Sequence, residues 1–208
     1  MKKTFLLFVI GLVSLSATAQ DTKQKVKYKP EYHHEAGVSS WYGFGDNYGL
    51  YLLDRNENIP TKNLWGIGLY ELHGIRFNPH FILSAEISAK FHYSYADYNS
   101  FYDGITTPCD VYGLRFLVGI NFKYIILKKY RWSPYIEANY LGGVLIHRTK
   151  GYNPRVVDGE ITKFRTVVDL SICAGATYRI TKQKGLFLGA GYQFPDNALL
   201  LKVGYQFR

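Results

Sequence analysis

Residues 81–95, FILSAEISAKFHYSY, alternate between two kinds of side chain. Every second residue from Phe81 to Tyr95 is uncharged and mostly apolar or aromatic, whereas the residues between them include Glu86, Lys90 and His92. A period of two predicts a β-strand with one apolar face and one polar face. This strand is longer than the ~5–6 residues of an ordinary strand. The chain must therefore fold so that one face of a long strand is removed from water or placed against lipid.

The same alternation recurs along the chain and predicts an all-β fold. The predicted strands cover residues 35–43, 64–76, 81–95, 111–124, 134–147, 165–179, 185–194 and 198–207. A high content of Tyr, Phe and Gly, with 19, 13 and 20 residues, is typical of such a fold. The second predicted strand fits least well, because Glu71 falls on its apolar face and indicates a bulge or a shifted register.

The connections between the predicted strands alternate in length. Short segments follow the second, fourth and sixth strands, whereas longer ones at 44–63, 96–110 and 148–164 follow the first, third and fifth. The connection at 195–197 is a short exception on the side of the long ones. We therefore expect one end of the structure to carry brief turns (the turn end) and the other to carry bulky loops (the loop end).

The N-terminal residues have the features of a secretory signal. Two lysines precede an apolar stretch at 5–15, and Ala17-Thr18-Ala19 forms an A-x-A cleavage site. The apolar stretch is too short for a spanning helix, which needs about 20 residues. We expect a protein that leaves the cytoplasm, with a cleaved signal peptide at 1–19, a polar periplasmic lead-in at 20–34 and a barrel domain at 35–208.

An eight-stranded antiparallel barrel accommodates the strand pattern in two ways. A soluble lipocalin-like barrel points its apolar face inward around a ligand, whereas a membrane barrel points it outward to lipid. Most of the predicted strands reach the ten or so residues that cross an apolar band ~25 Å tall. Aromatic residues at both ends of the apolar faces also favour the transmembrane barrel, which has two such girdles. The expected girdle residues are Trp65, Tyr93, Tyr95 and Tyr112 at the loop end, and Phe81, Tyr124, Tyr135, Tyr178, Tyr205 and Phe207 at the turn end.

The polar faces carry charges of both signs, which a membrane barrel encloses in its lumen. Unpaired charges there would be costly, so we hypothesise an ionic network that plugs the barrel. Arg115 is the expected hub, because its planar fork binds two carboxylates at once. The residues of this hypothetical network are Glu86, Lys90, Arg115, Glu137, Asp169, Arg179 and Lys202, and Glu35 and Lys123 face the same lumen.

Residues 35–208 resemble the small outer-membrane β-barrel proteins of Gram-negative bacteria, of the opacity-protein-like type. The resemblance rests on the strand pattern and on the ending VGYQFR. Family members end in a strand with alternating aromatic residues that the barrel-assembly machinery recognises, and Tyr205 and Phe207 supply that alternation here. The final residue is Arg208 rather than the usual Phe, which shifts the signal by one position. The resemblance implies a protein of the cell outer membrane, in contact with its lipids, with short periplasmic turns and longer extracellular loops.

The chain carries a net charge of +9, or +7 once the two signal-peptide lysines are removed. For an exported protein, this excess favours anionic lipid or a polyanionic envelope as a neighbour, rather than nucleic acid. An ordinary solvated surface explains the charge equally well.

Few residues indicate catalysis or cofactor binding. His92 lies near Ser94 and Glu86 on the polar face, as in some lipid-modifying barrels, but packing in the lumen is the simpler interpretation. His33 and His34 are adjacent, which alone is a weak indication of a metal site. No phosphate loop, dinucleotide motif or metal-spaced Cys/His cluster occurs in the sequence, so we expect no cofactor and no catalytic site.

The two cysteines, Cys109 and Cys173, fall at different depths of the predicted wall, roughly 20 Å apart by strand rise. Export to an oxidising compartment would permit a disulfide. A disulfide needs Cα atoms within ~4.4–6.8 Å of each other, so we expect two free thiols.

The favoured function is a non-enzymatic structural or adhesive role, in contact with an unknown extracellular or envelope partner. The long loops would carry this role, because they hold aromatic residues among mixed charges, which suits contact with protein or glycan. These aromatic residues are Tyr48, Tyr51, Phe101, Tyr102 and Tyr152. The alternatives are an envelope enzyme acting on lipid A or phospholipid, a narrow channel, and a soluble lipocalin-like carrier.

Overall fold

The computed structural model describes residues 29–44, 47–54, 57–99, 106–126, 131–151, 161–181, 183–194 and 196–207. The predicted signal peptide at 1–19 and the first part of the predicted lead-in lie outside these residues. Within the described ranges, no helix has the length and apolar character needed to cross a membrane.

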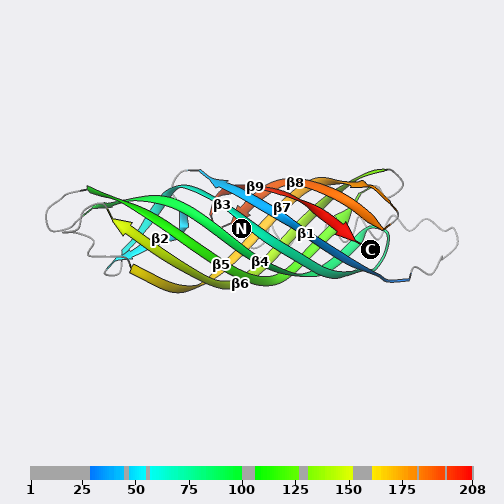
Figure 1. The fold of residues 1–208 in the computed structure, drawn as a ribbon, viewed down its shortest axis with the longest axis horizontal. Helices are drawn as coiled ribbons and strands as arrows, with labels where there is room; N and C mark the ends of the chain where they lie inside the picture. The colour runs from blue at the N-terminus through cyan, green and yellow to red at the C-terminus, as the bar shows by residue number, and fades with distance from the viewer. Residues whose placement is uncertain are drawn as a thin grey trace, which may run out of the picture.

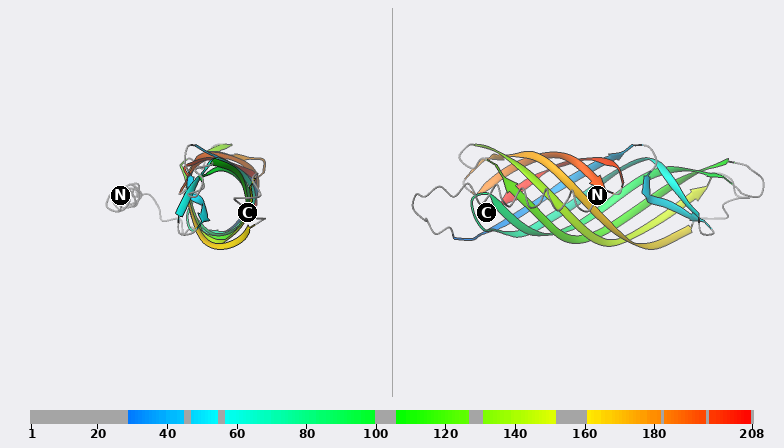
Figure 2. Two further views of the ribbon diagram at one scale, coloured as in Figure 1. Left: turned by 90° about the vertical axis from the view of Figure 1, so that its left-hand side faces the viewer. Right: turned by 180° about the vertical axis from the view of Figure 1, so that it is seen from behind.

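The described residues form a closed antiparallel barrel (Figure 1). The strands are β1 (Glu31–Gly43), β2 (Asn47–Asp54), β3 (Glu57–Arg76), β4 (Phe81–Asn99), β5 (Thr106–Ile125), β6 (Trp132–Gly151), β7 (Ile161–Arg179), β8 (Lys184–Phe194) and β9 (Ala198–Phe207). β1 pairs with both β3 and β9, which closes a circuit of eight strands, and the end-on view in Figure 2 shows the ring. β2 pairs with the start of β3 as a hairpin at the loop end. The predicted eight-stranded antiparallel barrel is confirmed.

The first strand begins earlier than predicted. β1 starts at Glu31, so residues 31–34 belong to the wall and not to the lead-in. His33 and Glu35 are buried inside the barrel, whereas Tyr32 is exposed on the outside. The period-two alternation therefore continues through polar residues that an apolar pattern does not reveal.

Most residues predicted as long loops continue the strands instead. β4 and β5 remain paired as far as Asn99 and Thr106, and β6 and β7 reach Gly151 and Ile161. The hairpin of β2 and β3 occupies most of the predicted loop at 44–63. The loop prediction followed the apolar faces, but backbone hydrogen bonds continue beyond them because every N–H and C=O needs a partner. Phe101, Tyr102 and Tyr152, and the side chains of Tyr48 and Tyr51, lie outside the part that the structure describes.

The predicted bulge or misregister at Glu71 is wrong. β3 stays in register with β4 from Trp65 to Arg76, so Glu71 lies on the outer face of the wall. The register shift occurs earlier, between Lys62 and Trp65, where Asn63 has a φ of 52°. An Asn tolerates this left-handed conformation better than most residues.

Apolar side chains fill two parts of the interior. The cluster near the turn end contains Tyr70, Leu72, Ile82, Ile125, Tyr135 and Phe187, and the other contains Trp41, Leu64, Leu145, Cys173, Ala198 and Leu200. Inward-facing glycines make room for large neighbours. A Cβ atom on Gly66 would lie 2.2 Å from Cζ2 of Trp41, and one on Gly113 would lie 2.0 Å from Nε2 of His92.

Candidate functional site

Large apolar side chains cover the outer face of the barrel and remain exposed. Along β5, Phe116 and Val118 are 47% and 60% exposed, whereas Arg115 on the inner face is 1% exposed. A soluble protein rarely exposes so continuous an apolar surface. The observed orientation is therefore that of a membrane barrel, with lipid outside, and not that of a lipocalin-like barrel.

Aromatic rings lie at both ends of this outer face. At the loop end, the ring centroids of Trp65 and Tyr112 lie 5.9 and 5.3 Å from that of Tyr93. At the turn end, the paired rings are Phe81 and Tyr124, Trp132 and Tyr178, and Tyr205 and Phe207. Tyr and Trp favour the two interfaces of a membrane, where the ring is buried and the polar tip stays hydrated.

Tyr135 does not belong to the turn-end girdle, so that prediction is wrong. Its side chain is 1% exposed and points into the lumen, as does Glu137 two residues further along β6. The ammonium group of Lys123 lies 4.6 Å from the centroid of the Tyr135 ring. Trp132 occupies the outer face of β6 at this end instead.

An ionic cluster centred on Arg115 lies in the half of the lumen toward the loop end. Nη1 of Arg115 donates to Asp169 at 2.8 Å and to Asp196 at 2.6 Å, and Nη2 donates to Asp196 at 3.0 Å. Lys90 donates to the second oxygen of Asp169 at 3.1 Å, and the Gln193 amide donates to Asp196 at 2.8 Å. These five residues form the loop-side cluster, and none is more than 5% exposed. Arg115 thus binds two buried carboxylates with one planar fork, and Lys90 supplies the second positive charge that balances them.

A second ionic cluster lies toward the turn end and is centred on Glu137. Nζ of Lys123 donates to Glu35 at 2.6 Å and lies 3.0 Å from Oε2 of Glu137. Nζ of Lys202 donates to the other oxygen of Glu137 and lies 3.9 Å from Glu86. These five residues form the turn-side cluster, in which one carboxylate is shared by two ammonium groups.

Aromatic rings and amides complete the surroundings of the turn-side cluster. The ammonium group of Lys202 lies 4.1 Å from the ring centroid of Tyr70, and that of Lys123 lies 5.0 Å from the ring centroid of Phe187. Such contacts replace part of the hydration that a buried ammonium group loses. The Asn139 amide donates to Glu86 at 2.8 Å.

Lys90, Arg115 and Asp169 of the hypothetical network lie in the loop-side cluster, and Glu86, Glu137 and Lys202 lie in the turn-side cluster, whereas Arg179 belongs to neither. Arg179 lies half-buried at the turn end of β7, where its backbone N–H donates to the carbonyl of Arg131 at 2.9 Å. The sequence hypothesis omitted Gln193 and Asp196. Gln193 shares the inward face of β8, so alternation could have found it. Asp196 lies in the turn between β8 and β9, where alternation does not apply.

His92, Ser94 and Glu86 do not form a hydrogen-bonded set. The His92 ring is fully buried over Gly113, and neither of its nitrogens has a hydrogen-bond partner among the described residues. Glu86 instead accepts a hydrogen bond from Asn139. A general base needs to reach the proton that it abstracts, so this geometry favours a packing role for His92.

The adjacent histidines and the two cysteines do not form joint sites. His33 points into the lumen and donates to Glu35 at 2.7 Å, while His34 points outward. Cys109 and Cys173 are both buried, and they are not joined by a disulfide.

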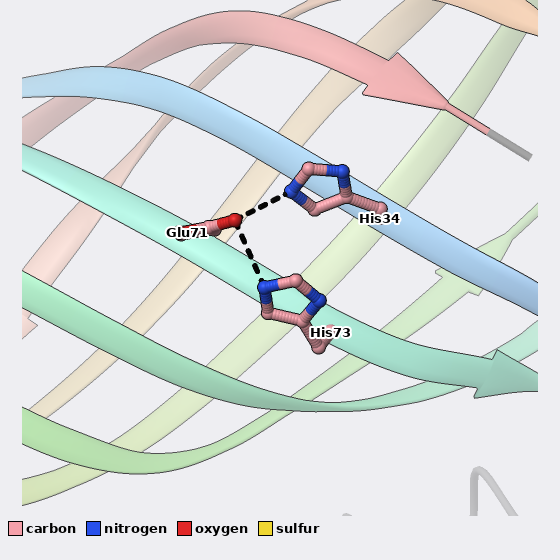
Figure 3. Close-up of side chains that lie close together, drawn as sticks. All are labelled: His34, Glu71 and His73. Atoms are coloured by element: carbon pink, nitrogen blue, oxygen red, sulfur yellow. Dashed lines mark hydrogen bonds and ion pairs between the residues drawn. The ribbon is translucent and has the colours of Figure 1, made fainter.

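Three side chains able to ligate metal meet on the outer face, near the turn end (Figure 3). His34 of β1 and His73 of β3 are direct partners across the two strands, and Glu71 lies two residues before His73. Oε1 of Glu71 accepts from Nε2 of His34 at 2.8 Å and from Nε2 of His73 at 2.9 Å. One ligand atom from each residue lies within 4.8 Å of the others, so the group could hold an ion. We call these three residues the outer triad.

No protein-family model and no curated protein matches the chain. Among solved structures, the chain is similar to Neisserial surface protein A, with 15% identity, 86% of this chain and 99% of that chain covered, and a TM-score of 0.46. The outer membrane protein OprG from Pseudomonas aeruginosa shows 11% identity, coverage of 85% and 94%, and a TM-score of 0.48. Ail, the attachment invasion locus protein of Yersinia pestis, shows 15% identity, coverage of 86% and 100%, and a TM-score of 0.38. At these values the likenesses transfer no function to this chain.

The structure of the barrel wall identifies the kind of fold. The circuit of eight antiparallel strands is closed, and so leaves no unpaired edge facing lipid. Its outer face is largely apolar between two aromatic girdles, with Glu71 as an exception, and the paired charges of the two ionic clusters lie inside. The chain is therefore an eight-stranded transmembrane β-barrel of the outer-membrane type, and the predictions of this fold and of a place in the cell outer membrane are confirmed.

Proposed function

We propose that this barrel is a plugged outer-membrane protein with a structural or adhesive role, and that it acts through its loop end. The loop end would then face the cell exterior and the turn end the periplasm. The observation that carries the proposal is the pair of ionic clusters inside the lumen.

Both clusters connect strands that are not neighbours in the sheet, and they therefore span the lumen. Arg115 of β5 binds Asp169 of β7, and Lys123 of β5 binds Glu35 of β1. The interior of an eight-stranded barrel is just wide enough for side chains to fill it. An ion crossing this lumen would have to displace buried, paired charges, which supports a closed barrel over a channel.

The loop end offers a surface for a partner. Phe194 at the end of β8 pairs with Leu170, so residues 161–169 of β7 continue beyond the β8–β9 turn. At ~3.3 Å per residue, this projection is about 30 Å along the strand. β3 to β6 are similarly long, and the β2–β3 hairpin adds to this side of the rim. A projecting rim of paired strands suits contact with an extracellular or envelope partner.

The barrel wall and its last strand suggest two envelope partners. The exposed apolar outer face would contact outer-membrane lipids. Tyr205 and Phe207 end β9 with alternating rings, 4.6 Å apart between centroids, and we propose them as the signal for the barrel-assembly machinery. Replacing Phe207 with Ala should then lower the amount of folded barrel in the outer membrane more than it lowers refolding in detergent.

A conductance measurement tests the plug, and a binding measurement tests the rim. The purified barrel in planar bilayers should give no steady, large conductance, and such a conductance would reject the plugged lumen. A variant in which a short Gly-Ser turn replaces residues 47–61 should still fold, as judged by heat-modifiable migration in detergent gels. That variant should lose binding to host cells or envelope glycans that the wild-type barrel binds. Equal binding by both proteins would contradict a role for this part of the rim.

The enzymatic alternative has a separate test. His92 is the residue on which it depends, and its buried ring has no hydrogen-bonded nucleophile beside it in the described structure. We therefore expect cells that express His92→Ala or the wild-type barrel to have the same lipid A and phospholipid profiles. A lipid change that depends on His92 would favour the enzyme.

A further inference from the structure

Glu71 is out of place for a lipid-facing side chain. It lies on the outer face of β3, between Leu69 and His73 on the same face, and its side chain is 50% exposed. Leu69 is 66% exposed, and Ile87, the cross-strand partner of Glu71 on β4, is 60% exposed, so the surroundings are apolar. A carboxylate on such a wall carries a cost unless something compensates its charge.

Two histidines stabilise the Glu71 carboxylate with hydrogen bonds, and both are held in place. The rings of His34 and His73 stack with centroids 4.6 Å apart, and the His34 ring also stacks on Phe207 at 5.2 Å. The hydroxyl of Tyr32 lies 2.5 Å from Nδ1 of His73. The imidazole Nε2 atoms of both histidines therefore point at one carboxylate oxygen from fixed rings (Figure 3).

The position of the outer triad allows access for an ion. Phe207 and Tyr205 belong to the turn-end aromatic girdle, where the wall meets the membrane interface. His34 pairs directly with Phe207 across β1 and β9, so the triad borders this girdle. A charged ion at an interface retains contact with water and headgroups, which the centre of the membrane would deny it.

We propose that His34, Glu71 and His73 form a binding site for a divalent transition-metal ion of the Zn²⁺ class. Two imidazole nitrogens and one carboxylate oxygen are the donor set that zinc takes in sites with one open position. Ligands ~2.0–2.2 Å from a tetrahedral ion lie about 3.4 Å from each other. Oε1 of Glu71 lies 2.8 Å from Nε2 of His34 and 2.9 Å from Nε2 of His73, so small side-chain rotations suffice to admit the ion.

Tyr32 suits both states of the site. Without an ion, Nε2 of His73 carries the proton that it donates to Glu71, and Nδ1 accepts from the Tyr32 hydroxyl. With an ion on Nε2, the proton moves to Nδ1, which then donates to the same hydroxyl oxygen, because a hydroxyl both donates and accepts. Metal-bound histidines usually have such a partner on their other nitrogen.

The donor set also selects the class of ion. Ca²⁺ and Mg²⁺ prefer oxygen ligands throughout and higher coordination numbers, so they should bind weakly here. Imidazole suits Zn²⁺, Co²⁺, Ni²⁺ and Cu²⁺. The fourth position would face the interface, where water or the phosphate of a lipid headgroup could occupy it.

The test uses the folded barrel in detergent micelles, titrated with Co²⁺ as a spectroscopic substitute for Zn²⁺. We expect one equivalent of Co²⁺ to give visible absorption of low-symmetry, near-tetrahedral cobalt, and Zn²⁺ but not Mg²⁺ to remove it. Free Zn²⁺ at 100 times its Kd should shift the unfolding equilibrium about 100-fold toward the folded barrel. The proposal would be overturned if Co²⁺ gave no absorption band and Zn²⁺ gave no shift of the unfolding equilibrium.

Matched variants locate the ion. Glu71→Gln removes a charge from an apolar wall, so this variant should still fold. Both Glu71→Gln and His73→Gln should lose the Co²⁺ absorption. Tyr32→Phe should lower the affinity roughly 10–100-fold, the usual effect of losing a partner of a metal-bound histidine. His80→Gln, whose ring bonds the Ile125 carbonyl at the same end, should bind Co²⁺ as the wild type does. Wild-type binding by Glu71→Gln and His73→Gln would mean that the triad is only hydrogen-bonded.

Discussion

Arg115 and Phe116 are neighbours in β5 and lie on opposite sides of one wall. Arg115 is 1% exposed and binds two carboxylates, whereas Phe116 is 47% exposed and faces outward. In a soluble barrel, the exposed position would be the polar one. The reversal shows that each face is matched to a different medium, lipid outside and a filled, charged lumen inside.

The difference between the two faces also shows which residues do not fit the face on which they lie and therefore need an explanation. A charge inside the lumen is ordinary here, provided that it is paired. A charge on the outer wall is not, and Glu71 is notable because its neighbours on the same face include Leu69 and Ile75. A ring inside the lumen, such as that of Tyr135, serves a buried ammonium group and not the membrane interface.

The largest effect should come from removing the hub of the loop-side cluster. Arg115→Ala leaves Asp196 without its bidentate partner, and leaves Asp169 with Lys90 and a 3.4 Å hydrogen bond from the Gln193 amide. Breaking a buried ion pair costs about 3–5 kcal/mol, because a buried charge loses its compensation. Urea unfolding in lipid vesicles should show this loss, and conductance should show whether a leak opens.

The control for Arg115→Ala is Lys184→Ala at the turn end. Lys184 is exposed, and an exposed substitution usually changes the stability by no more than about 0.5 kcal/mol. If the two variants match in stability and in conductance, the lumen is filled by water and the inner face is not a plug.

The next effect tests the outer face at the adjacent position. Phe116→Arg places a charge where lipid is expected near mid-wall, and Leu170→Arg does the same on β7. Arg at the bilayer midplane costs about 2–4 kcal/mol of barrel stability. Normal insertion and urea stability of both variants would mean that the faces have been assigned the wrong way round.

The facing of most strand residues could be predicted from the sequence, because alternation is a local property of the backbone. Once Phe116 is placed outside, Arg115 has to point inward. The partners could not be predicted, since they depend on the register around a closed circuit. Lys123 and Glu35 meet although 88 residues separate them, and only the pairing of β1 with β3 and β9 brings them together.

Three features of the structure could not be predicted from the apolar pattern, each for a physical reason. Asp196 belongs to a turn, whose side chains follow no period, and it folds into the lumen. The upper parts of the long strands lie beyond the apolar band, where pairing needs only backbone hydrogen bonds. The outer triad required both the true register at Glu71 and the contact of β1 with β3, so its residues looked unrelated in the sequence.

A smaller effect should follow from changing the hub of the turn-side cluster. Glu137→Gln keeps the shape of the side chain but removes the charge that Lys123 and Lys202 share. Lys123 keeps Glu35, and Lys202 keeps Glu86 at 3.9 Å. We therefore expect a loss of about 1.5–3 kcal/mol, the range for hydrogen bonds to charged groups. Urea unfolding of Glu137→Gln and Arg115→Ala under the same conditions shows which variant loses more stability. A larger loss for Glu137→Gln would show that the turn-side cluster is the main plug.

The smallest effect should come from moving the outward Arg to the end of the same strand. Tyr112 faces the same side as Phe116 but lies in the loop-end girdle, beside Tyr93 at 5.3 Å between ring centroids. An Arg at this depth can extend its guanidinium group to the interface while its stem stays in the apolar band. The cost of a charge on the outer wall falls to about 0–1 kcal/mol near the interface. Urea unfolding of Tyr112→Arg and Phe116→Arg in the same vesicles measures the difference directly. Equal losses at the two positions would mean that the apolar band reaches further toward the loop end than the aromatic girdle indicates.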